Sequence, residues 1–472
     1  MRPLELTLSI LTILSAILYL IPSISTRLKY QFIPAGLIAA TTVQILYEGF
    51  RWQLWPVVFA IFLIIIAAGV RQPNRTPKRN PTRIGTVGLI LSVFSLGLGW
   101  VLPVPQPFPI TGPYQVGTTI FPLTDTSRTD RYADQPDAPR EIMVQIWYPA
   151  APTEKNQRIP WIPNIESVGP ALADWFGLPS FSLDHLIYAY GNTYLYAPVA
   201  SGNEIFPVLV FSHGWSGFKE QNIYQVEELA SHGYVVVGID HTYGAVLTVF
   251  PNGREIPLNN DALPEGVPEA EYDTASNRLV RQWAGDISFA LDEIAHINRA
   301  SEGWPLAGRI DLGSIGIFGH STGGGAAAEF CATDPRCDAV LMMDLWAEPL
   351  SDYVITQGLP QPFLLMHSAG WTDLDDPSPN LLRIGELVSA SSGEMTEFRI
   401  AGTEHYDFSI LPLLSPLAGA LGLKGPIPGG SGLVLINYYT VAFFDQYLRG
   451  EDQGLLLPAN SPFEAAQFNL RP

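Results

Sequence analysis

The stretch that decides the fold is Ser314-Ile-Gly-Ile-Phe-Gly-His-Ser-Thr-Gly-Gly-Gly-Ala-Ala-Ala-Glu-Phe330. It begins with the apolar run Ile315–Phe318, which predicts a buried strand, and it ends in alanines, which favour a helix. Between them lies a G-x-S-x-G pattern, typical of a serine on a sharp turn from strand to helix. Side chains two residues before and after the serine would collide there, and glycine has none. The pattern predicts that Ser321 is a nucleophile on a turn made with Gly319, His320 and Gly323.

Strands and helices alternate on both sides of this turn. Short apolar runs, each long enough for one buried strand, recur at Pro207–Ser212, Tyr234–Ile239, Ala339–Met343, Pro362–His367 and Phe398–Ala401. Segments with a helical spacing of apolar residues lie between several of them. Near-continuous apolar strands that alternate with helices predict a mostly parallel sheet covered on both faces. We therefore expect residues 104–472 to form one catalytic domain of α/β class, with the α/β-hydrolase fold.

The first 103 residues have the composition of a membrane domain. They contain four apolar segments, at Leu4–Ile21, Ile33–Leu46, Leu54–Val70 and Ile84–Leu102. The first, third and fourth are long enough to span a bilayer, whereas the second is shorter and contains a glutamine. Tryptophans lie near the ends of the segments, where interfacial rings are expected. We expect residues 1–103 to form an all-α bundle of about four transmembrane helices.

The Lys and Arg residues of this part predict how the helices are oriented. Residues 1–103 hold nine of the chain's 26 Lys and Arg residues but only two of its 45 acids. The bases gather after the first apolar segment, at Arg27 and Lys29, and after the third, within Arg71–Arg83. Basic loops stay cytoplasmic, so the fourth helix would leave the membrane outward. We expect a multi-pass protein of the cell membrane with an extracytoplasmic catalytic domain.

The composition of residues 104–472 excludes several classes of function. This part holds the remaining 17 Lys and Arg residues and the remaining 43 acids, so nucleic-acid binding is not expected. The chain's two cysteines, Cys331 and Cys337, are too few for a cysteine-rich zinc site. They flank a short turn, and an oxidising compartment would permit a disulfide between them. Two free buried thiols are the alternative.

A nucleophilic serine needs a base to take its proton and an acid to orient that base. In α/β-hydrolases the three residues follow one another in the order serine, acid, histidine. Only His367 and His405 come after Ser321. His367 ends an apolar strand, where a histidine is usually structural, whereas His405 lies on a turn directly after a strand. We expect His405 to be the base.

Two positions compete for the role of the acid. Asp344 closes the strand next to that of the nucleophile and precedes the expected base, so we favour it; the alternative is a helix N-cap. Asp373 begins a group with Asp375 and Asp376 after the following strand, where many α/β-hydrolases carry the acid. Such a group is also ordinary in a solvated loop of an acidic domain.

The tetrahedral intermediate of ester hydrolysis needs two backbone amides aimed at its oxyanion. One is the amide of the residue after the nucleophile, Thr322. The loop after the strand Pro207–Ser212 supplies the other in this fold, and its His213-Gly214-Trp215 sequence can turn an amide inward. We expect an oxyanion hole formed by the amides of Trp215 and Thr322, with His213 as a packing residue.

Five motifs stand in this order along the chain: Phe211-Ser-His-Gly, Ala230-Ser-His-Gly-Tyr, Gly319-His-Ser-Thr-Gly-Gly, Met343-Asp-Leu-Trp-Ala-Glu-Pro-Leu and Gly402-Thr-Glu-His. Together they resemble the platelet-activating-factor acetylhydrolase family, over roughly residues 110–450. The resemblance implies a triad of Ser321, Asp344 and His405, with no metal and no cofactor. It also implies calcium-independent hydrolysis of short or oxidised sn-2 acyl groups of phospholipids. The N-terminal helices and an acidic insert near Asn252–Asp273 depart from the family's pattern and bear on the substrate.

Two alternatives remain open. The loop after Pro362–His367 also resembles bacterial triacylglycerol lipases and polyester hydrolases, in which the acid would fall near Asp373. The chain would then be a broad carboxylesterase, lipase or polyester hydrolase with the same catalytic chemistry. A membrane protein with a degenerate hydrolase domain is the non-enzyme alternative, which the intact set of candidate residues disfavours. The expected partner is a lipid or a small ester, and the sequence leaves protein partners undetermined.

The segment Ile410–Leu423, shortly after the expected base, is apolar throughout and is followed by Lys424. Apolar segments of this kind usually pack in a core. The alternative is a position near the mouth of the active site, facing lipid, so that substrate would arrive from the outer leaflet.

Overall fold

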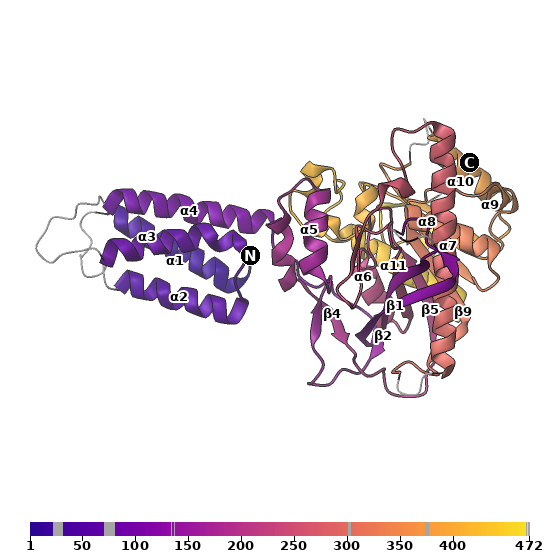
Figure 1. Cartoon of the computed structure of the whole chain (residues 1–472), viewed down its shortest axis with the longest axis horizontal. Coiled ribbons are helices and arrows are strands. Elements are labelled where there is room, and N and C mark those ends of the chain that lie inside the picture. The colour runs from indigo at the N-terminus through magenta and orange to yellow at the C-terminus, as the bar shows by residue number, and fades with distance from the viewer. Residues whose placement is uncertain are drawn as a thin grey trace, which may run out of the picture. The chain divides into compact units, whose positions relative to one another are not determined.

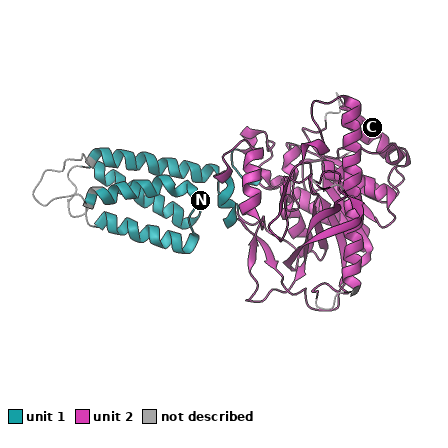
Figure 2. Ribbon diagram, in the orientation of Figure 1, with its two compact units in different colours: residues 1–105, 183–188, 413–417 teal, residues 106–182, 189–412, 418–472 magenta. Residues whose placement is uncertain are grey.

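Figure 1 shows the computed structural model of the chain, which describes residues 1–21, 32–69, 81–133, 135, 137–300, 304–372, 377–468 and 470. The chain divides into two compact units, coloured separately in Figure 2. Unit 1 consists of residues 1–105 and two short later segments, 183–188 and 413–417; unit 2 consists of residues 106–182, 189–412 and 418–472. Each unit has a hydrophobic core of its own.

All four apolar segments of the first 103 residues are helical over their described parts. The helices of unit 1 are α1 (Pro3–Leu20), α2 (Ile33–Glu48), α3 (Trp55–Gly69) and α4 (Pro81–Val101). Large apolar side chains from α1, α2 and α3 form their common core: Leu8, Tyr19, Leu37, Val57, Ile61 and Ile64. The predicted all-α organisation of this part is therefore confirmed.

Two of these helices are long and apolar enough to cross a membrane. They are α1, over Pro3–Leu20, and α4, over Thr82–Val101. The apolar stretch at α3, Trp52–Ile66, is shorter, and α2 has 16 residues. A helix that crosses the hydrocarbon core unaided needs about 20 residues, because each adds only about 1.5 Å. We expected about four spanning helices, but by length and composition two of the described helices could span a membrane.

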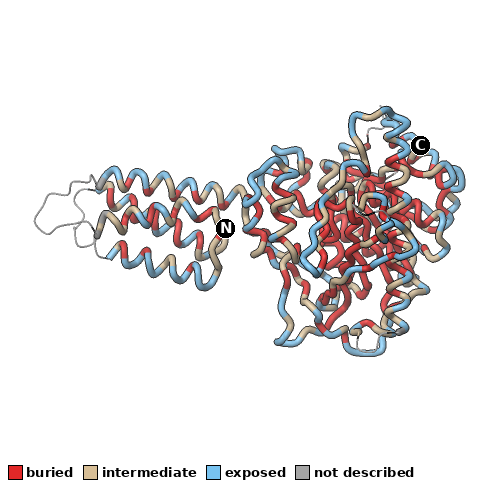
Figure 3. Tube along the Cα trace, viewed as in Figure 1, coloured by how far each residue is buried: buried red, intermediate tan, exposed pale blue. Residues whose placement is uncertain are grey.

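Unit 1 exposes large apolar side chains on its outside and buries several polar side chains beside its apolar core. Leu14 of α1 is 52% exposed and Phe94 of α4 is 57% exposed, whereas Ser9, Thr12 and Ser92 are fully buried. Figure 3 shows the exposed positions alternating with buried ones along each helix. Water-soluble helices show the opposite pattern, with a polar outer face. The outer face of unit 1 is therefore unusually apolar.

A buried ion pair lies where the helices of unit 1 begin and end. The side chains of Glu5, in the first turn of α1, and Arg51, just before α3, are both fully buried, with 2.7 Å between Glu5 Oε2 and Arg51 Nη2. Arg51 also donates from Nη1 to the carbonyl oxygen of Leu102, directly after α4, at 2.9 Å. Removing one partner of a buried pair leaves an uncompensated charge, at a cost of about 3–5 kcal/mol. The pair therefore ties three helix ends together.

Eleven strands form one sheet in the described part of unit 2, in the order β13-β12-β11-β10-β9-β5-β6-β2-β1-β4-β3. Its bounds are β1 Gln115–Thr129, β2 Pro139–Ala150, β3 Arg158–Pro160, β4 Tyr190–Leu195, β5 Phe206–Ser212, β6 Val235–Asp240, β9 Ile310–His320, β10 Ala339–Met343, β11 Phe363–Ser368, β12 Met395–Ile400 and β13 Ala466–Phe468. Neighbours from β6 to β12 pair in parallel, and β2 and β13 add antiparallel strands outside them. The predicted mostly parallel sheet is confirmed.

Helices cover both faces of this sheet. They are α5 (Ile165–Trp175), α6 (Ile223–Ser231), α7 (Glu269–Ala300), α8 (Thr322–Thr333), α9 (Asp352–Gln357), α10 (Pro379–Ala390) and α11 (Ser431–Arg449). Val210 of β5 and Ile317 of β9 belong to the core that α7 and α8 complete. The next residues along these strands, Phe211 and Phe318, face the other way, and Phe318 contacts Phe444 of α11 at 6.1 Å between ring centroids. This alternation of side chains places the sheet between two helical layers.

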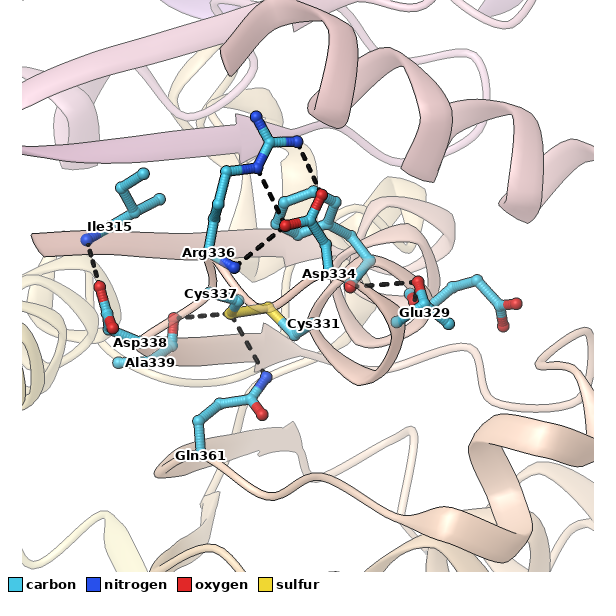
Figure 4. The surroundings of a disulfide bond; sticks show 11 residues. Ile315, Glu329, Cys331, Asp334, Arg336, Cys337, Asp338, Ala339 and Gln361 are labelled. Carbon is cyan, nitrogen blue, oxygen red and sulfur yellow. Dashed lines mark hydrogen bonds and ion pairs between the residues drawn. A yellow bond between two sulfur atoms is a disulfide. The ribbon is translucent and has the colours of Figure 1, made fainter. Parts of the chain in front are cut away.

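Cys331 and Cys337 form a disulfide between α8 and β10, as Figure 4 shows. The bond closes a loop with a sequence separation of six residues. Within this loop, Arg336 pairs with Asp334 at 2.7 Å. Directly after it, the Asp338 carboxylate accepts a hydrogen bond from the amide of Ile315 on β9 at 2.8 Å. Of the two states that the sequence left open, the structure has the disulfide, and it fixes the connection between the nucleophile's helix and the next strand.

Intact mass should show this bond directly. The native chain should be two hydrogen atoms lighter than the reduced chain and should take up alkylating reagent at both cysteines only after reduction. Closing so short a loop stabilises the folded state by about 2 kcal/mol in the chain-entropy model, so reduction should lower the unfolding temperature of unit 2. Alkylation of the unreduced native chain would contradict the assignment.

Candidate active site

Ser321 lies on the turn between the end of β9 and the start of α8. Its backbone has φ 56° and ψ −117°, a conformation that residues other than glycine rarely adopt. Its amide donates to the carbonyl oxygen of Met343, the last residue of β10, at 2.9 Å. Backbone strain of this kind is kept where the surrounding structure holds it, and it gathers at functional sites.

Two glycines make this turn possible. A Cβ on Gly319 would lie 2.2 Å from the carbonyl oxygen of Gly323. A Cβ on Gly323 would lie 2.1 Å from the carbonyl oxygen of Ser212, at the end of β5. Both distances are far below van der Waals contact, and the neighbouring atoms are backbone that has no room to move. Only glycine therefore fits at either position.

The carboxylate of Asp344 is hydrogen-bonded to the ring of His405. Asp344 Oδ2 lies 2.9 Å from His405 Nδ1, and the carboxylate is fully buried directly after β10. Ser368, at the end of β11, donates to the same carboxylate from its amide and its hydroxyl, both at 2.6 Å. Three donors hold the acid in one orientation, so the Asp344 carboxylate fixes the Nδ1–H tautomer of His405.

Two rings enclose the imidazole of His405. Trp371 stacks on it, with 4.2 Å between ring centroids, and His320 lies at 4.5 Å on a tilted plane. His320 Nε2 lies 3.1 Å from the carbonyl oxygen of His405, which can only accept, and His320 Nδ1 accepts from Gln221 at 3.0 Å. Burial lowers the pKa of His320 well below its usual value, with the nearby His405 adding to the effect. His320 is therefore a neutral ring that supports the backbone of His405.

A pocket of about 620 Å³ opens in front of these residues. Ser321 and His405 line it, together with the loop from Gly214 to Phe218. Its apolar and aromatic lining comes from several segments of unit 2: Leu172, Trp175, Val246, Leu258, Tyr406 and Leu411. Asp174 and Glu265 also reach it, and among the described residues that line it none is Lys or Arg. The volume and the lining are those of a site for a largely apolar small molecule.

The expected oxyanion donors lie beside the nucleophile. Thr322 is the first residue of α8, and the first four amides of a helix have no partner within it. Trp215 lines the pocket, and its amide has no acceptor in the part of the chain that the structure describes. A Cβ on the adjoining Gly214 would lie 3.5 Å from the Cβ of Ser321. Both amides can therefore serve a reacting carbonyl at Ser321.

The other candidates lie elsewhere. His367 is fully buried and pairs with Glu397 at 3.0 Å, on neighbouring strands and away from the pocket. Asp344 does not cap α9, because the side chain of Ser351 does so. The alternative acids Asp373, Asp375 and Asp376 lie outside the described residues.

Sequence reasoning did not identify three residues that hold the site: Ser368, Trp371 and Gln221. Ser368 follows the apolar run of β11, and a polar residue at the end of a parallel strand is a usable signal. Trp371 and Gln221 stand in loops without a pattern of their own, so only the folded chain reveals their contacts.

His320, Asp344 and His405 also offer one possible metal-ligand atom each, all within 4.8 Å of one another. His405 Nδ1 and Asp344 Oδ2 already bond to each other, and both ring nitrogens of His320 have partners. The cluster is therefore internally hydrogen-bonded, and a metal would have to displace those bonds.

The chain is similar to several known proteins. The model of the family "Platelet-activating factor acetylhydrolase, isoform II" matches residues 105–454. The platelet-activating factor acetylhydrolase of Cavia porcellus is 26% identical over 361 residues, which cover 71% of this chain and 77% of that protein. The probable 1-alkyl-2-acetylglycerophosphocholine esterase of Arthroderma benhamiae is 27% identical over 399 residues, which cover 79% of this chain and 95% of that protein.

Among solved structures, a ferulic acid esterase from Streptomyces cinnamoneus has a TM-score of 0.60 at 24% sequence identity. The match covers 76% of this chain and 98% of that chain. At this identity the likeness shows the fold, and it supports the predicted α/β-hydrolase architecture of unit 2. The predicted family resemblance is confirmed by a model that matches well over half of the sequence. The chain belongs to the platelet-activating factor acetylhydrolase, isoform II, family, and it is an ester hydrolase.

Proposed function

We propose that the chain is a membrane-anchored serine ester hydrolase that cleaves short or oxidised acyl esters of phospholipids. Ser321 is the nucleophile, His405 the general base and Asp344 the acid that orients it. The observation that carries this proposal is the 2.9 Å hydrogen bond between Asp344 and His405 beside the strained serine turn. The three groups follow one another along the chain in the order that this fold uses.

The reaction runs in two halves. Ser321 Oγ attacks the ester carbonyl carbon while His405 Nε2 takes the hydroxyl proton, and the carbonyl π electrons move onto oxygen. Collapse of this tetrahedral intermediate breaks the bond to the alcohol, which leaves with the proton from His405. Water then attacks the acyl-enzyme by the same route and releases the carboxylic acid and free Ser321. Asp344 stabilises the imidazolium that forms in each half.

The amides of Trp215 and Thr322 would receive the negative charge that develops on the carbonyl oxygen. Donors of this kind are effective because they are already oriented before the reaction starts. Loss of one such donor typically reduces kcat about 10²- to 10³-fold. Two amides from two different segments converge on one atom, which explains the need for the close packing around Gly214 and Gly323.

The pocket supports a lipid-like ester with a short acyl group. Its volume of about 620 Å³ is modest for a phospholipid, so a long acyl chain would have to extend outside it. The absence of Lys and Arg among its described lining residues, with Asp174 and Glu265 present, disfavours an anionic group near Ser321. One of the two relatives is named an acetylhydrolase of platelet-activating factor and the other a probable esterase of 1-alkyl-2-acetylglycerophosphocholine, and these names support the same substrate class.

Residues 1–103 would form the membrane anchor and residues 104–472 the catalytic domain. The two long apolar helices and the apolar outer face of unit 1 support this division. The ion pair of Glu5 with Arg51 is hidden inside unit 1, as charges within a membrane protein usually are. A disulfide persists in oxidising compartments, so the bond between Cys331 and Cys337 supports an extracytoplasmic catalytic domain.

The nucleophile can be tested by changing Ser321 alone. Ser321→Ala should lower kcat on p-nitrophenyl acetate by at least about 10³-fold, because no other hydroxyl can form the acyl-enzyme. A fluorophosphonate should label the wild-type chain at Ser321 and should not label the variant. The comparison uses the full-length chain in detergent. Labelling that persists in Ser321→Ala would contradict the assignment of Ser321 as the nucleophile.

The acid is tested by a pair of matched amide variants. Asp344→Asn should keep the fold and lower kcat about 10⁴-fold, because the amide no longer holds the correct tautomer of His405. Asp373→Asn should stay within about threefold of wild type, as expected for a loop residue without a catalytic role. Steady-state kinetics of both variants measure the effect on catalysis, and their unfolding temperatures show whether the fold is kept. The opposite order of activities would move the acid to Asp373.

Entry of substrate from the lipid is tested at the apolar segment after His405. Leu411 lines the pocket, Leu417 and Leu421 are 37% and 64% exposed, and residues 413–417 group with unit 1. Leu417→Asp combined with Leu421→Asp should slow hydrolysis of liposomal phospholipid at least about tenfold, since full withdrawal of a leucine from lipid forfeits roughly 1.5–3 kcal/mol and about 1.4 kcal/mol changes a rate tenfold. Hydrolysis of p-nitrophenyl acetate should be unchanged.

Equal losses on both substrates would mean that the segment acts as core. The wild-type chain supplies a second comparison, between an oxidised phospholipid and tributyrin. A clear preference for tributyrin would favour a broad carboxylesterase.

A further inference from the structure

A second hydrogen-bonded chain of polar groups lies behind the pocket. Hydrogen bonds join Ser212 to His241 and His241 to Asp286. Ser212 Oγ lies 2.9 Å from His241 Nε2, and His241 Nδ1 lies 2.9 Å from Asp286 Oδ2. The three residue types are those of a catalytic triad. All three side chains, however, are fully buried and line no part of the pocket. A role other than contact with substrate must therefore explain this chain.

The negative charge of Asp286, the last of these three hydrogen-bonded residues, is compensated. Arg140 is fully buried as well, and its Nη2 lies 2.6 Å from Asp286 Oδ2. Burial alone would raise the pKa of Asp286, but the Arg140 guanidinium and the His241 ring hold it well below its usual range. Asp286 is thus an ionised acceptor, and it takes the Nδ1 hydrogen of His241. Trp283 stacks on the same ring, with 4.2 Å between centroids, so His241 cannot turn.

The backbone of His241 in turn orients His213. The amide of His241 donates to His213 Nε2 at 3.3 Å. His213 Nδ1 lies 2.7 Å from the carbonyl oxygen of Gly214, which can only accept, so Nδ1 carries the hydrogen. Burial lowers the pKa of His213 well below its usual value, and the neighbouring His241 adds to this. His213 is therefore neutral, with one tautomer that satisfies both nitrogens.

The carbonyl that His213 holds belongs to the same peptide unit as the amide of Trp215. A trans peptide is planar, so its C=O and N–H point in opposite directions, and the described chain has no cis peptide bond. The carbonyl oxygen of Gly214 accepts a second hydrogen bond, from the amide of Gly217 at 2.8 Å. Two donors thus fix the direction of the Gly214 carbonyl, and the Trp215 N–H of the same peptide unit must point in the opposite direction.

We propose that His213 is a positioning residue that presets the direction of the Trp215 amide, and that Asp286 and His241 act on the oxyanion hole through it. His213 then does more than fill space, which was its expected role. The inference rests on the proposed function, because it concerns the amide that would receive the negative charge. The chemistry it serves is the same acyl transfer at Ser321.

Two substitutions at His213 distinguish the hydrogen bond made by Nδ1 from the one made by Nε2. In His213→Asn, the side-chain NH₂ takes the place of Nδ1 and can still donate to the carbonyl of Gly214, while the acceptor for His241 is lost. In His213→Gln, the longer amide reaches the position of Nε2, and the donor to Gly214 is lost. The two variants have similar size and polarity, so each is the other's control for packing.

His213→Gln in the full-length chain should lower kcat about 10²-fold or more on p-nitrophenyl acetate, the effect of losing one oxyanion donor, with little change in KM. Affinity for a trifluoromethyl ketone, which forms a tetrahedral adduct, should fall by a similar factor. His213→Asn should keep most of the wild-type kcat and of this affinity. Equal losses in both variants, in proportion to their losses in unfolding temperature, would overturn the proposal.

A measurement on the wild-type chain remains decisive even if neither variant folds. Nitrogen NMR of ¹⁵N-histidine protein should show two buried histidines, His213 and His241, each with a hydrogen on Nδ1 in slow exchange and each unprotonated between pH 5 and 8. An Nε2–H tautomer, or protonation of His213 in this range, would refute the role. Failure of the proposed function gives a different result, namely hydrolysis and fluorophosphonate labelling that survive Ser321→Ala.

Discussion

The catalytic side of unit 2 depends on how closely Gly323 approaches the end of β5. No Cβ fits between it and the carbonyl oxygen of Ser212, so the first turn of α8 packs directly on the backbone of the neighbouring strand. The parallel register pairs Ser212 with Gly319 across the two strands. As a result the loop after β5 and the turn after β9 emerge side by side, and Gly214 lies next to Ser321. Substituting Gly323 would therefore disturb the nucleophile and the oxyanion loop together.

The carboxyl ends of six neighbouring parallel strands supply the polar groups of the site. The loop after β5 contributes Trp215, that after β6 His241, that after β9 Ser321 and that after β10 Asp344. Ser368 ends β11, and His405 lies in the loop after β12. Open α/β sheets bind their ligands at this edge because the loops there converge while the strands remain buried. The reactive groups thus lie on short loops held by a rigid sheet, which suits a reaction that requires fixed geometry.

Burial separates the roles of the histidines around the site. His213, His241 and His320 are buried, each has both ring nitrogens hydrogen-bonded, and burial lowers the pKa of each. The side chain of His405 is 21% exposed, contacts the acid on one side and lines the pocket on the other. The three buried rings keep one protonation state, and their hydrogen bonds hold the backbone and side chains around them in fixed positions. Only His405 among these four has an open side through which a proton can pass to and from substrate.

Local patterns in the sequence were enough to predict the serine turn, the mostly parallel sheet and the helices of residues 1–103. A G-x-S-x-G turn depends on the absence of side chains within five residues, and strands and helices follow from apolar spacing, so neither requires knowledge of distant contacts. The chain order left His367 and His405 as candidates for the base, and the turn position of His405 was enough to favour it; the structure pairs His367 with Glu397 instead. The number of spanning helices was less predictable, because α2 has 16 residues and α3 has 15, and two of the described helices reach spanning length.

Tertiary structure alone decided which groups hold the site in place. Trp371 and Gln221 lie in no motif, and the motif that contains His213 does not reveal its role. Their partners, and those of Ser368, are 24 or more residues away or depend on the rotation of one peptide unit. A hydrogen-bond direction or a histidine tautomer is set by the atoms within about 3 Å of each ring nitrogen. The register of the parallel strands brings those atoms together, and neighbours in sequence do not reveal it.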